Sequence, residues 1–318
     1  MMFNRSLLGS TKVKTAAVLA IGALALTACT NASDTAGNGA QASSGSSSAP
    51  SFDPSSVQKD DALAAKVPAA IKAKGTLTVG SDTSYAPAEF LGADGQTPVG
   101  YDVDIAKAIG ATLGLKVQVQ TAEFTGILPA LGPKYDLGIS SFTINKDRLA
   151  AVNLVSYFNA GTSWAVQKGN PKNFSLDDIC GRSIGVQTGT TQEDPDLKTR
   201  SKKCTDAGKK AIDVVTLKNQ TDVTTRLVNG SIDAMAADSP IIAYALQQTN
   251  GQLEKFGDTY DSAPEGIAVA KSDTALASLI QETVNKLIAD GDYKKILDGW
   301  GNSDGAVTKS ELNPTPAS

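Results

Sequence analysis

The sequence predicts an α/β protein of two lobes, with a mixed sheet in each lobe. Short apolar strands alternate with amphipathic helices from residue 75 onward, and the alternation forms two successive blocks. This alternation favours sheets that are rich in parallel pairs, because each helix returns the chain to the same edge of its sheet. The length of 318 residues is enough for about two ordinary domains.

The first block is predicted to contain three strands and two helices. The strands are residues 76–80, 116–120 and 135–139, and the helices are residues 100–115 and 125–133. In the longer helix, apolar residues recur at helical spacing at Val103, Ala106, Ile109 and Leu113. Pro129 lies inside the pattern of the shorter helix, so we expect it to limit that helix.

The second block has the same construction and is followed by two further helices. Its strands are predicted at residues 183–187, 211–217, 232–238 and 266–270, and its helices at residues 220–230, 239–249, 275–290 and 292–300. Gly230 marks the end of one helix, and Pro240 suits the first turn of the next because that position needs no amide hydrogen. We expect residues 302–318 to form a flexible tail.

The N-terminus has the features of a secretion signal. Basic residues precede an apolar run at residues 15–26, which is too short to cross a bilayer as a helix. Small residues and Cys29 follow in "LTAC", which resembles a bacterial lipobox. The lipobox implies that residues 1–28 are removed and that Cys29 takes a lipid, such as palmitate, that anchors the chain to the outer face of the cell membrane. The alternative is an ordinary signal peptide with an incidental cysteine.

The segment that follows Cys29 is predicted to be a flexible linker, residues 29–57. It consists largely of serine, glycine and alanine, which bury too little apolar surface to hold a fold. The formal net charge of the chain is −4, and removal of residues 1–28 takes away three positive charges and leaves −7. A net negative charge argues against nucleic acid as a partner.

Cysteine and histidine content narrows the chemistry further. Apart from Cys29, the chain has only Cys180 and Cys204, and an even pair outside the cytoplasm predicts a disulfide. The alternative is two separate buried thiols. The chain has no histidine, which excludes histidine-based catalytic triads and most zinc sites. We therefore expect no metal, no cofactor and no enzymatic activity.

Polar side chains follow several predicted strands at the point where each strand ends. They are Asp82, Ser140, Ser141, Thr143, Arg148, Thr190, Thr191 and Asp238. Ligands of open α/β sheets bind beyond the carboxyl ends of the strands. Arg148 can hold a carboxylate with two parallel hydrogen bonds, and Asp238 can accept from an ammonium, so the set suits a zwitterion. Taken singly, each residue could equally be a helix cap or a core residue.

With these residues in place, the sequence resembles the extracytoplasmic solute-binding proteins of the amino-acid type, the family 3 binding subunits of ABC importers. The resemblance covers about residues 75–301 and rests on "GSDTSYAPAEF", "VGYDVDIAKAIG", "FTGILPAL", "YDLGISSFTINKDR", "VQTGTTQ", "GSIDAMAADSP" and "ADGDYKKILDGWG". It implies a periplasmic-binding-protein-like fold of type II with two hinge crossovers. It also implies a small-molecule amino acid as ligand, a membrane permease as partner, and a monomer.

The resemblance further implies which residues hold the main-chain groups of the ligand. Arg148 would bind the ligand α-carboxylate, with help from Thr143 and Thr191. Asp238 would bind the α-ammonium, and Ser141 would supply further hydrogen bonds. Apart from the resemblance, the position of Thr190 after a strand suggests that backbone N–H groups near it add donors at a helix start.

Five more positions would surround the ligand side chain, according to the same resemblance. The aromatic rings of Tyr85 and Phe124 would sandwich it, Ser140 would border its pocket, and Asp82 and Gln187 would read its far end. One position departs from the family pattern. In "YAPAE", Ala88 stands directly after the proline, where the family usually has an aromatic residue. Whether this alanine widens the pocket stays open at this point.

The charges predict the class of amino acid. Arg148 and Asp238 neutralise a zwitterion, so Asp82 leaves one negative charge for the ligand side chain, and two aromatic rings can hold a cation. This favours arginine, lysine, ornithine or histidinium. Glutamine comes next, because an aspartate at this position can also accept from an amide, whereas glutamate would need a further cation.

The expected mechanism is gating by lobe closure. The first lobe would comprise residues 75–162 and 266–301, and the second residues 163–265, with hinges near residues 161–165 and 264–268. A ligand that contacts both lobes favours the closed state, which would then dock on the permease. Two alternatives are an enzyme that resembles cyclohexadienyl dehydratase, with Glu89 as its acid or base, and a ligand-sensing receptor domain.

Overall fold

The computed structural model describes residues 52–316 of the protein. The predicted signal peptide at residues 1–28, the lipid on Cys29 and most of the predicted linker at residues 29–57 lie outside the described residues. Among residues 52–316, no helix is long and apolar enough to cross a membrane.

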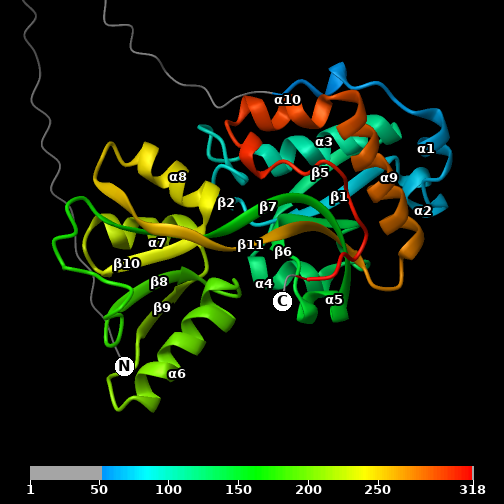
Figure 1. Cartoon of the computed structure of the whole chain (residues 1–318). Helices are drawn as coiled ribbons and strands as arrows, with labels where there is room; N and C mark the ends of the chain where they lie inside the picture. The colour runs from blue at the N-terminus through cyan, green and yellow to red at the C-terminus, as the bar shows by residue number, and fades with distance from the viewer. Residues whose placement is uncertain (1–51, 317–318) are drawn as a thin grey trace, which may run out of the picture. The chain divides into compact units, whose positions relative to one another are not determined.

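A mixed sheet of eight strands runs through the described chain in the order β5-β1-β6-β11-β7-β10-β8-β9 (Figure 1). Its strands are β1 (Thr76–Ser81), β5 (Lys116–Thr121), β6 (Leu137–Thr143), β7 (Val152–Gln167), β8 (Ser183–Gln187), β9 (Asp213–Leu217), β10 (Ala234–Asp238) and β11 (Leu253–Ala270). A smaller antiparallel sheet contains β2 (Ser84–Tyr85), β3 (Glu89–Leu91) and β4 (Pro98–Val99).

The large sheet divides into two lobes that share its two central strands. In the first lobe, β1 pairs in parallel with β5 and β6. In the second lobe, β8 pairs in parallel with β9 and β10. The long strands β7 and β11 are antiparallel to each other and join the two halves. The predicted α/β fold with two lobes is confirmed, and the sheets of both lobes are continuous through β7 and β11.

The sequence did not predict most of strands β7 and β11. Of their residues, it predicted only the strand at residues 266–270. Strand β7 has 16 residues and is buried on both faces over nearly its whole length, so it lacks the alternation of apolar and polar residues that marks a half-buried strand. Strand β11 has 18 residues, and its pairing with β7 shifts register between Phe256 and Tyr260. The polar composition of that part of β11 resembles a loop.

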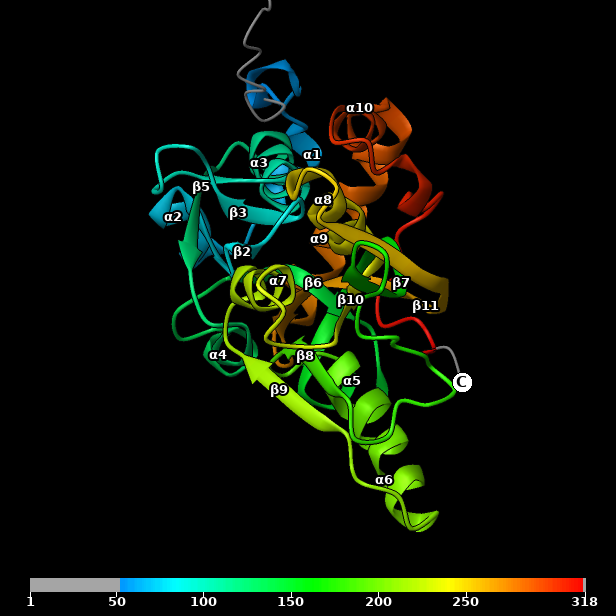
Figure 2. The same cartoon turned by 90° about the vertical axis from the view of Figure 1, so that its left-hand side faces the viewer.

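Helices lie beside the sheet in both lobes (Figures 1 and 2). They are α1 (Asp61–Ala65), α2 (Ala69–Lys74), α3 (Tyr101–Leu113), α4 (Phe124–Ile127), α5 (Lys146–Ala151), α6 (Lys198–Asp206), α7 (Gln220–Val228), α8 (Ser239–Gln248), α9 (Thr274–Asp290) and α10 (Asp292–Gly299). Helices α3, α9 and α10 pack on one another over the first lobe, and α7 packs on β8 in the second. Helix α6 was not expected, because its sequence has no apolar stripe.

The segment around β6 differs from its prediction. The predicted strand ends at residue 139, but β6 continues to Thr143, so Ser140 and Ser141 lie within the strand. The hydroxyls also do not cap the following helix. Asn145 is the N-cap of α5, and its side chain accepts a hydrogen bond from the Arg148 backbone N–H at 2.8 Å. Burial in the first lobe overrides the preference of serine for turns.

The predicted disulfide is confirmed. Cys180 and Cys204 are joined with a Cα–Cα distance of 5.5 Å. The bond ties the segment before β8 to helix α6, which carries Cys204. It therefore attaches the peripheral helix of the second lobe to the central part of that lobe.

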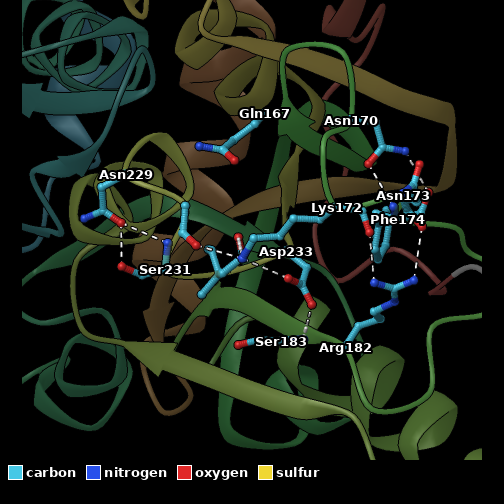
Figure 3. A network of polar contacts seen from close by, with 12 residues as sticks. Gln167, Asn170, Lys172, Asn173, Phe174, Arg182, Ser183, Asn229, Ser231 and Asp233 are labelled. Atoms are coloured by element: carbon cyan, nitrogen blue, oxygen red, sulfur yellow. Dashed lines mark hydrogen bonds and ion pairs between the residues drawn. The ribbon is translucent and has the colours of Figure 1, made fainter.

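A polar network holds the connection between β7 and β8 against the second lobe (Figure 3). The Lys172 ammonium donates to the Gly230 carbonyl oxygen at 2.7 Å and forms an ion pair with Asp233 at 3.0 Å. Arg182 donates to the carbonyl oxygens of Lys172 and Asn173 at 3.0 and 3.1 Å. These contacts fix the chain just before β8, the strand that ends at Gln187.

The C-terminal segment differs from the expected flexible tail. Ser310 is fully buried, and its hydroxyl donates to the Ser156 carbonyl oxygen in β7 at 2.7 Å. The Asn313 backbone N–H donates to the Leu154 carbonyl oxygen at 2.7 Å. Strand β7 supplies these partners, and composition alone does not reveal them. The segment from residue 302 therefore packs on the sheet at least as far as Asn313.

Removal of the disulfide is expected to lower the free energy of unfolding. The bond links residues with a sequence separation of 24, and closing a loop of that size restricts the unfolded chain by about 3 kcal/mol. Urea unfolding of the wild type and of Cys180→Ser/Cys204→Ser measures the difference. Reductant should lower the midpoint of the wild type but not of the double variant, and a wild-type midpoint that ignores reductant would contradict the prediction.

Candidate functional site

A small cavity lies between the two lobes. Its lining residues are Tyr85, Phe124, Ser140, Ser141, Thr143 and Arg148 from the first lobe and Gln187, Thr190, Thr191, Gln192 and Asp238 from the second. Ten of the eleven predicted site residues are therefore brought together. Asp82 is not among the lining residues, and Gln192 joins them without having been predicted.

Arg148 is the cation of this cavity and is held in place by backbone oxygens. Its Nη1 donates to the Thr143 carbonyl oxygen at 2.9 Å, and its Nη2 donates across to the Gly189 carbonyl oxygen of the second lobe at 3.2 Å. The guanidinium lies over the rings of Phe124 and Phe142, at 5.3 and 5.7 Å from the ring centroids. Desolvation lowers the pKa of Arg148 to about 10, so it stays charged at neutral pH. Within residues 52–316, its other N–H donors make no hydrogen bond to protein, and a guanidinium with open donors can bind an anion.

Asp238 supplies the carboxylate on the opposite side of the cavity. It lies at the end of β10 and begins α8 without capping it, because its side chain makes no hydrogen bond to that helix. Its Oδ2 accepts from the Tyr85 hydroxyl at 2.8 Å, and its Oδ1 accepts from Gln192 Nε2 at 2.9 Å. Burial raises the pKa of Asp238, and these two hydrogen bonds act against that shift. Gln192 is thus a positioning partner of Asp238.

Gln192 was missed because its sequence signal is weak. It stands in the quoted motif "VQTGTTQ", directly after the hydroxyls that were chosen. Its second hydrogen bond goes to Thr162 Oγ1 in β7 at 3.1 Å. Since β7 was not predicted as a strand, this contact between Gln192 and the sheet could not be anticipated.

Ser140 and Ser141 lie side by side in β6 and have different surroundings. Ser140 Oγ accepts from the Asp82 backbone N–H at 3.0 Å and donates to Glu89 at 2.7 Å. Ser141 has a positive φ of 48°, which is strained for a residue with a side chain. Among the described residues its buried Oγ has no hydrogen-bond partner. Strain and an unpaired hydroxyl in a cavity wall are typical of a binding position.

The second lobe contributes a tight turn after β8. Gly189 has a φ of 83°, and an added Cβ would lie 2.5 Å from Thr125 Cγ2, so only glycine fits there. The Thr190 hydroxyl donates to the Gln187 carbonyl oxygen at 2.7 Å. Thr191 then precedes the segment Gln192–Leu197, which is kinked at Asp194. The turn brings both threonines against the first lobe.

Ala88, the alanine at the position where the family usually has an aromatic residue, does not line the cavity. It is fully buried. Phe90 does not take the place of an aromatic there either, because its ring packs on Tyr244 and Trp300 at centroid distances of 5.7 and 5.9 Å. The departure at Ala88 therefore concerns the core of the first lobe.

Three buried carboxyl groups lie behind the cavity wall. Glu89, Asp102 and Glu265 have exposed fractions of 0%, 0% and 1%. Burial raises the pKa of all three, and that of Asp102 reaches about 7. The Tyr157 hydroxyl donates to Asp102 Oδ2 at 2.8 Å and the Ser141 N–H donates to the same oxygen at 3.2 Å. None of the three lines the cavity.

These carboxyls predict that the protein loses stability as pH rises from 4 toward 8. A group whose pKa is raised by folding stabilises the folded state below its unfolded pKa, and that stability disappears as pH passes the folded pKa. Each such carboxyl contributes a slope of about 1.4 kcal/mol per pH unit while it titrates. Asp102→Asn should flatten the curve of unfolding free energy against pH, whereas the exposed Asp258→Asn should not. If Asp102→Asn left the curve of unfolding free energy against pH unchanged, the predicted contribution of Asp102 to the pH dependence would be wrong.

The sequence matches a family of bacterial binding proteins and a curated relative in that class. The profile of the bacterial extracellular solute-binding proteins, family 3, matches residues 77–303. The chain is also 32% identical over 255 residues to the arginine-binding protein ArgT of Corynebacterium glutamicum, which covers 80% of this chain and 83% of that protein.

Solved structures share the fold. An ancestral arginine-binding protein bound to arginine is 36% identical with a TM-score of 0.64, over 71% of this chain and 98% of that one. An ancestral amino acid-binding protein described as a precursor of cyclohexadienyl dehydratase is 30% identical with a TM-score of 0.64, over 73% of this chain and 97% of that one.

Proposed function

The chain belongs to the bacterial extracellular solute-binding proteins of family 3, and from this premise we propose that it binds a polar amino acid outside the cytoplasm and delivers it to the permease of an ABC importer. The observation that carries the proposal is the cavity between the lobes, which has one cation, Arg148, on one side and one carboxylate, Asp238, on the other. A free amino acid carries the complementary pair of charges. We also propose that the mature chain is a monomer anchored by a lipid on Cys29.

The main-chain groups of the ligand would bind at these two charges. Arg148 would take the α-carboxylate with its free N–H donors, and the hydroxyls of Thr143 and Thr191 would assist. Asp238 would accept from the α-ammonium, and Ser141, whose side chain also lies near the buried Glu265 carboxyl, would supply a further hydrogen bond. These groups are common to all amino acids, so they supply affinity without distinguishing one amino acid from another.

The ligand side chain would lie between Tyr85 and Phe124 and end near Gln187. We propose a cationic amino acid, with arginine first and lysine, ornithine and histidinium after it, and glutamine as the next candidate. Arg148 is the only cation among the lining residues, and it is needed for the α-carboxylate, so a glutamate side chain would meet no second cation. The relative from Corynebacterium glutamicum is named for arginine, which supports the same order.

Binding would close the lobes about β7 and β11. We propose lobes at residues 75–162 with 266–301 and at residues 163–265, with hinges near residues 161–165 and 264–268. Contacts between the lobes include the ion pair of Lys218 with Glu123 at 2.6 Å and the bond from the Gln220 N–H to Ser84 Oγ at 3.2 Å. A ligand held by both lobes adds to these contacts only in the closed state and shifts the population toward it.

An enzymatic function is the weaker alternative. Glu89, the acid or base that such an enzyme would use, is fully buried, accepts from Ser140 Oγ at 2.7 Å and does not line the cavity. A general acid or base must lie within hydrogen-bond reach of the group that it protonates, and Glu89 does not itself face the cavity. We therefore propose binding without catalysis, and we see no feature that favours a receptor domain.

Calorimetry with the twenty amino acids tests the proposed function. The protein without residues 1–28 and without lipid should bind arginine at micromolar concentration or more tightly. Lysine, ornithine, histidine and glutamine should follow, and glutamate should not bind. The absence of micromolar binding by any amino acid would overturn the importer proposal.

A further inference from the structure

A second cavity lies on the face of strand β7 that points away from the candidate ligand cavity. Thr162 and Ser163 are neighbours in β7, and the side chains of neighbouring strand residues point to opposite faces. Thr162 Oγ1 accepts from Gln192 Nε2 at 3.1 Å, and Gln192 lines the candidate ligand cavity. Ser163 instead lines the second cavity. This rear cavity therefore lies behind the strands about which the lobes are proposed to close.

The walls of the rear cavity come from both lobes. The second lobe supplies one face of helix α8, which includes Pro240, Ala243 and Leu246. The first lobe supplies a wall from the C-terminal segment, within residues 301–305. Since the two walls belong to different lobes, the width of the rear cavity depends on the angle between the lobes.

The C-terminal wall is firmly attached to the first lobe. Gly305 is buried against the ring of Phe158 in β7, because an added Cβ would lie 2.1 Å from Phe158 Cζ. The next residue, Ala306, forms a β-bridge with Phe158. The family profile ends at residue 303, so Asp304 and these contacts lie beyond the matched region. This wall is thus partly a feature of this chain that the family profile does not include.

Two charged side chains line the rear cavity, and they come from opposite lobes. Lys255 lies in the second-lobe part of β11, and Asp304 lies in the C-terminal wall. Both are exposed, and Lys255 Nζ donates to Thr259 Oγ1 at 3.0 Å. Within residues 52–316, neither charge forms an ion pair. Opposite charges attract, so this pair favours a movement that brings the two walls together.

We propose that the rear cavity contains an opening stop, formed by the C-terminal wall and α8, which meet when the lobes open. Two lobes that turn about a common axis approach each other on one side of the axis as they separate on the other. Opening would therefore end when residues 301–305 reach α8, and the approach of Lys255 to Asp304 would stabilise the open state. The inference rests on the proposed function.

An opening stop sets the affinity for ligands without touching them. The apparent affinity of a protein falls with the fraction of molecules in the binding-competent state. A change that disfavours the open state should therefore tighten the binding of every ligand by the same factor. It should also slow ligand release, because a bound ligand leaves only after the lobes open. A residue that contacts the ligand side chain would instead change the ratios between ligands.

A wedge in the rear cavity tests the stop. Ala243 is exposed on the face of α8 that lines the cavity, so Ala243→Trp should block the approach of the two walls. Arginine and glutamine should both bind about 5-fold or more tightly, because an overpacked contact penalises the open state. Small-angle X-ray scattering should show a smaller radius of gyration for the unliganded variant than for the unliganded wild type.

The matched control for the wedge is Gln247→Trp. Gln247 is exposed on the same helix but does not line the rear cavity. The variant should bind arginine and glutamine as the wild type does, and its unliganded radius of gyration should not change.

Charge reversal tests the same stop without a wedge. Lys255→Glu and Asp304→Lys each place two like charges across the rear cavity, so each should tighten arginine binding by about 2- to 5-fold at low salt. The double variant restores an opposite pair and should bind as the wild type does, a strongly non-additive result. High salt should remove the effects of the single variants. Lys209→Glu, which reverses an exposed charge outside the rear cavity, should change nothing.

The outcomes separate this proposal from the proposed function. Unchanged or weaker binding in Ala243→Trp, or additive effects of the two charge reversals, would overturn the opening stop while the importer proposal stands. Failure of the wild type to bind any amino acid would overturn the importer proposal, and the radius of gyration of the unliganded wedge variant would still decide the stop. If Ala243→Trp does not fold, the cycle of Lys255 and Asp304 decides alone, since both residues are exposed.

Discussion

Arg148→Ala is expected to weaken amino-acid binding by about 2–5 kcal/mol, which is roughly 30- to 5,000-fold in the dissociation constant. The Thr143 carbonyl oxygen holds the guanidinium within its own lobe, and the Gly189 carbonyl oxygen of the second lobe adds a second bond in the closed state. The variant loses the only cation of the cavity lining and leaves the ligand α-carboxylate without a charged partner. Calorimetry with the preferred amino acid measures the effect.

Two controls make this result specific to the α-carboxylate. Agmatine is arginine without that carboxylate, so its weak binding should change little on Arg148→Ala. Arg226→Ala removes an exposed arginine from α7 and should leave arginine binding unchanged. Equal losses for arginine and agmatine, or full affinity in Arg148→Ala, would remove Arg148 from its proposed role.

Asp238→Asn is expected to weaken binding by a similar amount, about 2–5 kcal/mol, because it removes the charge that faces the α-ammonium. The variant keeps the size of the side chain, and its amide oxygen can still accept one of the two bonds that Tyr85 and Gln192 donate. The loss of binding affinity should therefore come mainly from the removed charge and only slightly from changed packing. Calorimetry with arginine and with glutamine measures it.

The loss in Asp238→Asn should be the same for every amino acid that binds, since all share the α-ammonium. This uniformity separates Asp238 from Gln187, whose substitution should change the ratios between ligands. An arginine analogue without the α-amino group should lose little affinity. A loss that depends strongly on the ligand side chain would show that Asp238 does not bind the ammonium.

The local signals in the sequence were strong enough to locate most helices and the short parallel strands. Apolar spacing at Val103 and Ile109 predicts α3, and the glycine at Gly230 predicts the end of α7 within a few residues. The sequence patterns did not predict strands that are completely buried or that have an irregular register. Strand β7 has no polar face to reveal its period, and β11 shifts register against it.

In the candidate site too, the sequence predicted some features and missed others. Arg148, Asp238 and the hydroxyls near them were identified because charged and polar residues at strand ends are conspicuous in the sequence. The partners of these side chains were not. Gln192 was missed because its contacts with Asp238 and Thr162 join segments that are 46 and 30 residues apart.

The sequence by itself determined the alternation of strands and helices, the disulfide pair and the residues with suitable chemistry for a zwitterion. These are properties of local pattern and of residue type. The tertiary structure alone decided which groups are free to act. Asp82 and Gln187 look equally able to contact a ligand in the sequence, yet the fold surrounds the Asp82 carboxylate with donors of its own lobe and leaves Gln187 in the cavity wall. Hydrogen-bond capacity is limited, and its use depends on neighbours that only the folded chain brings together.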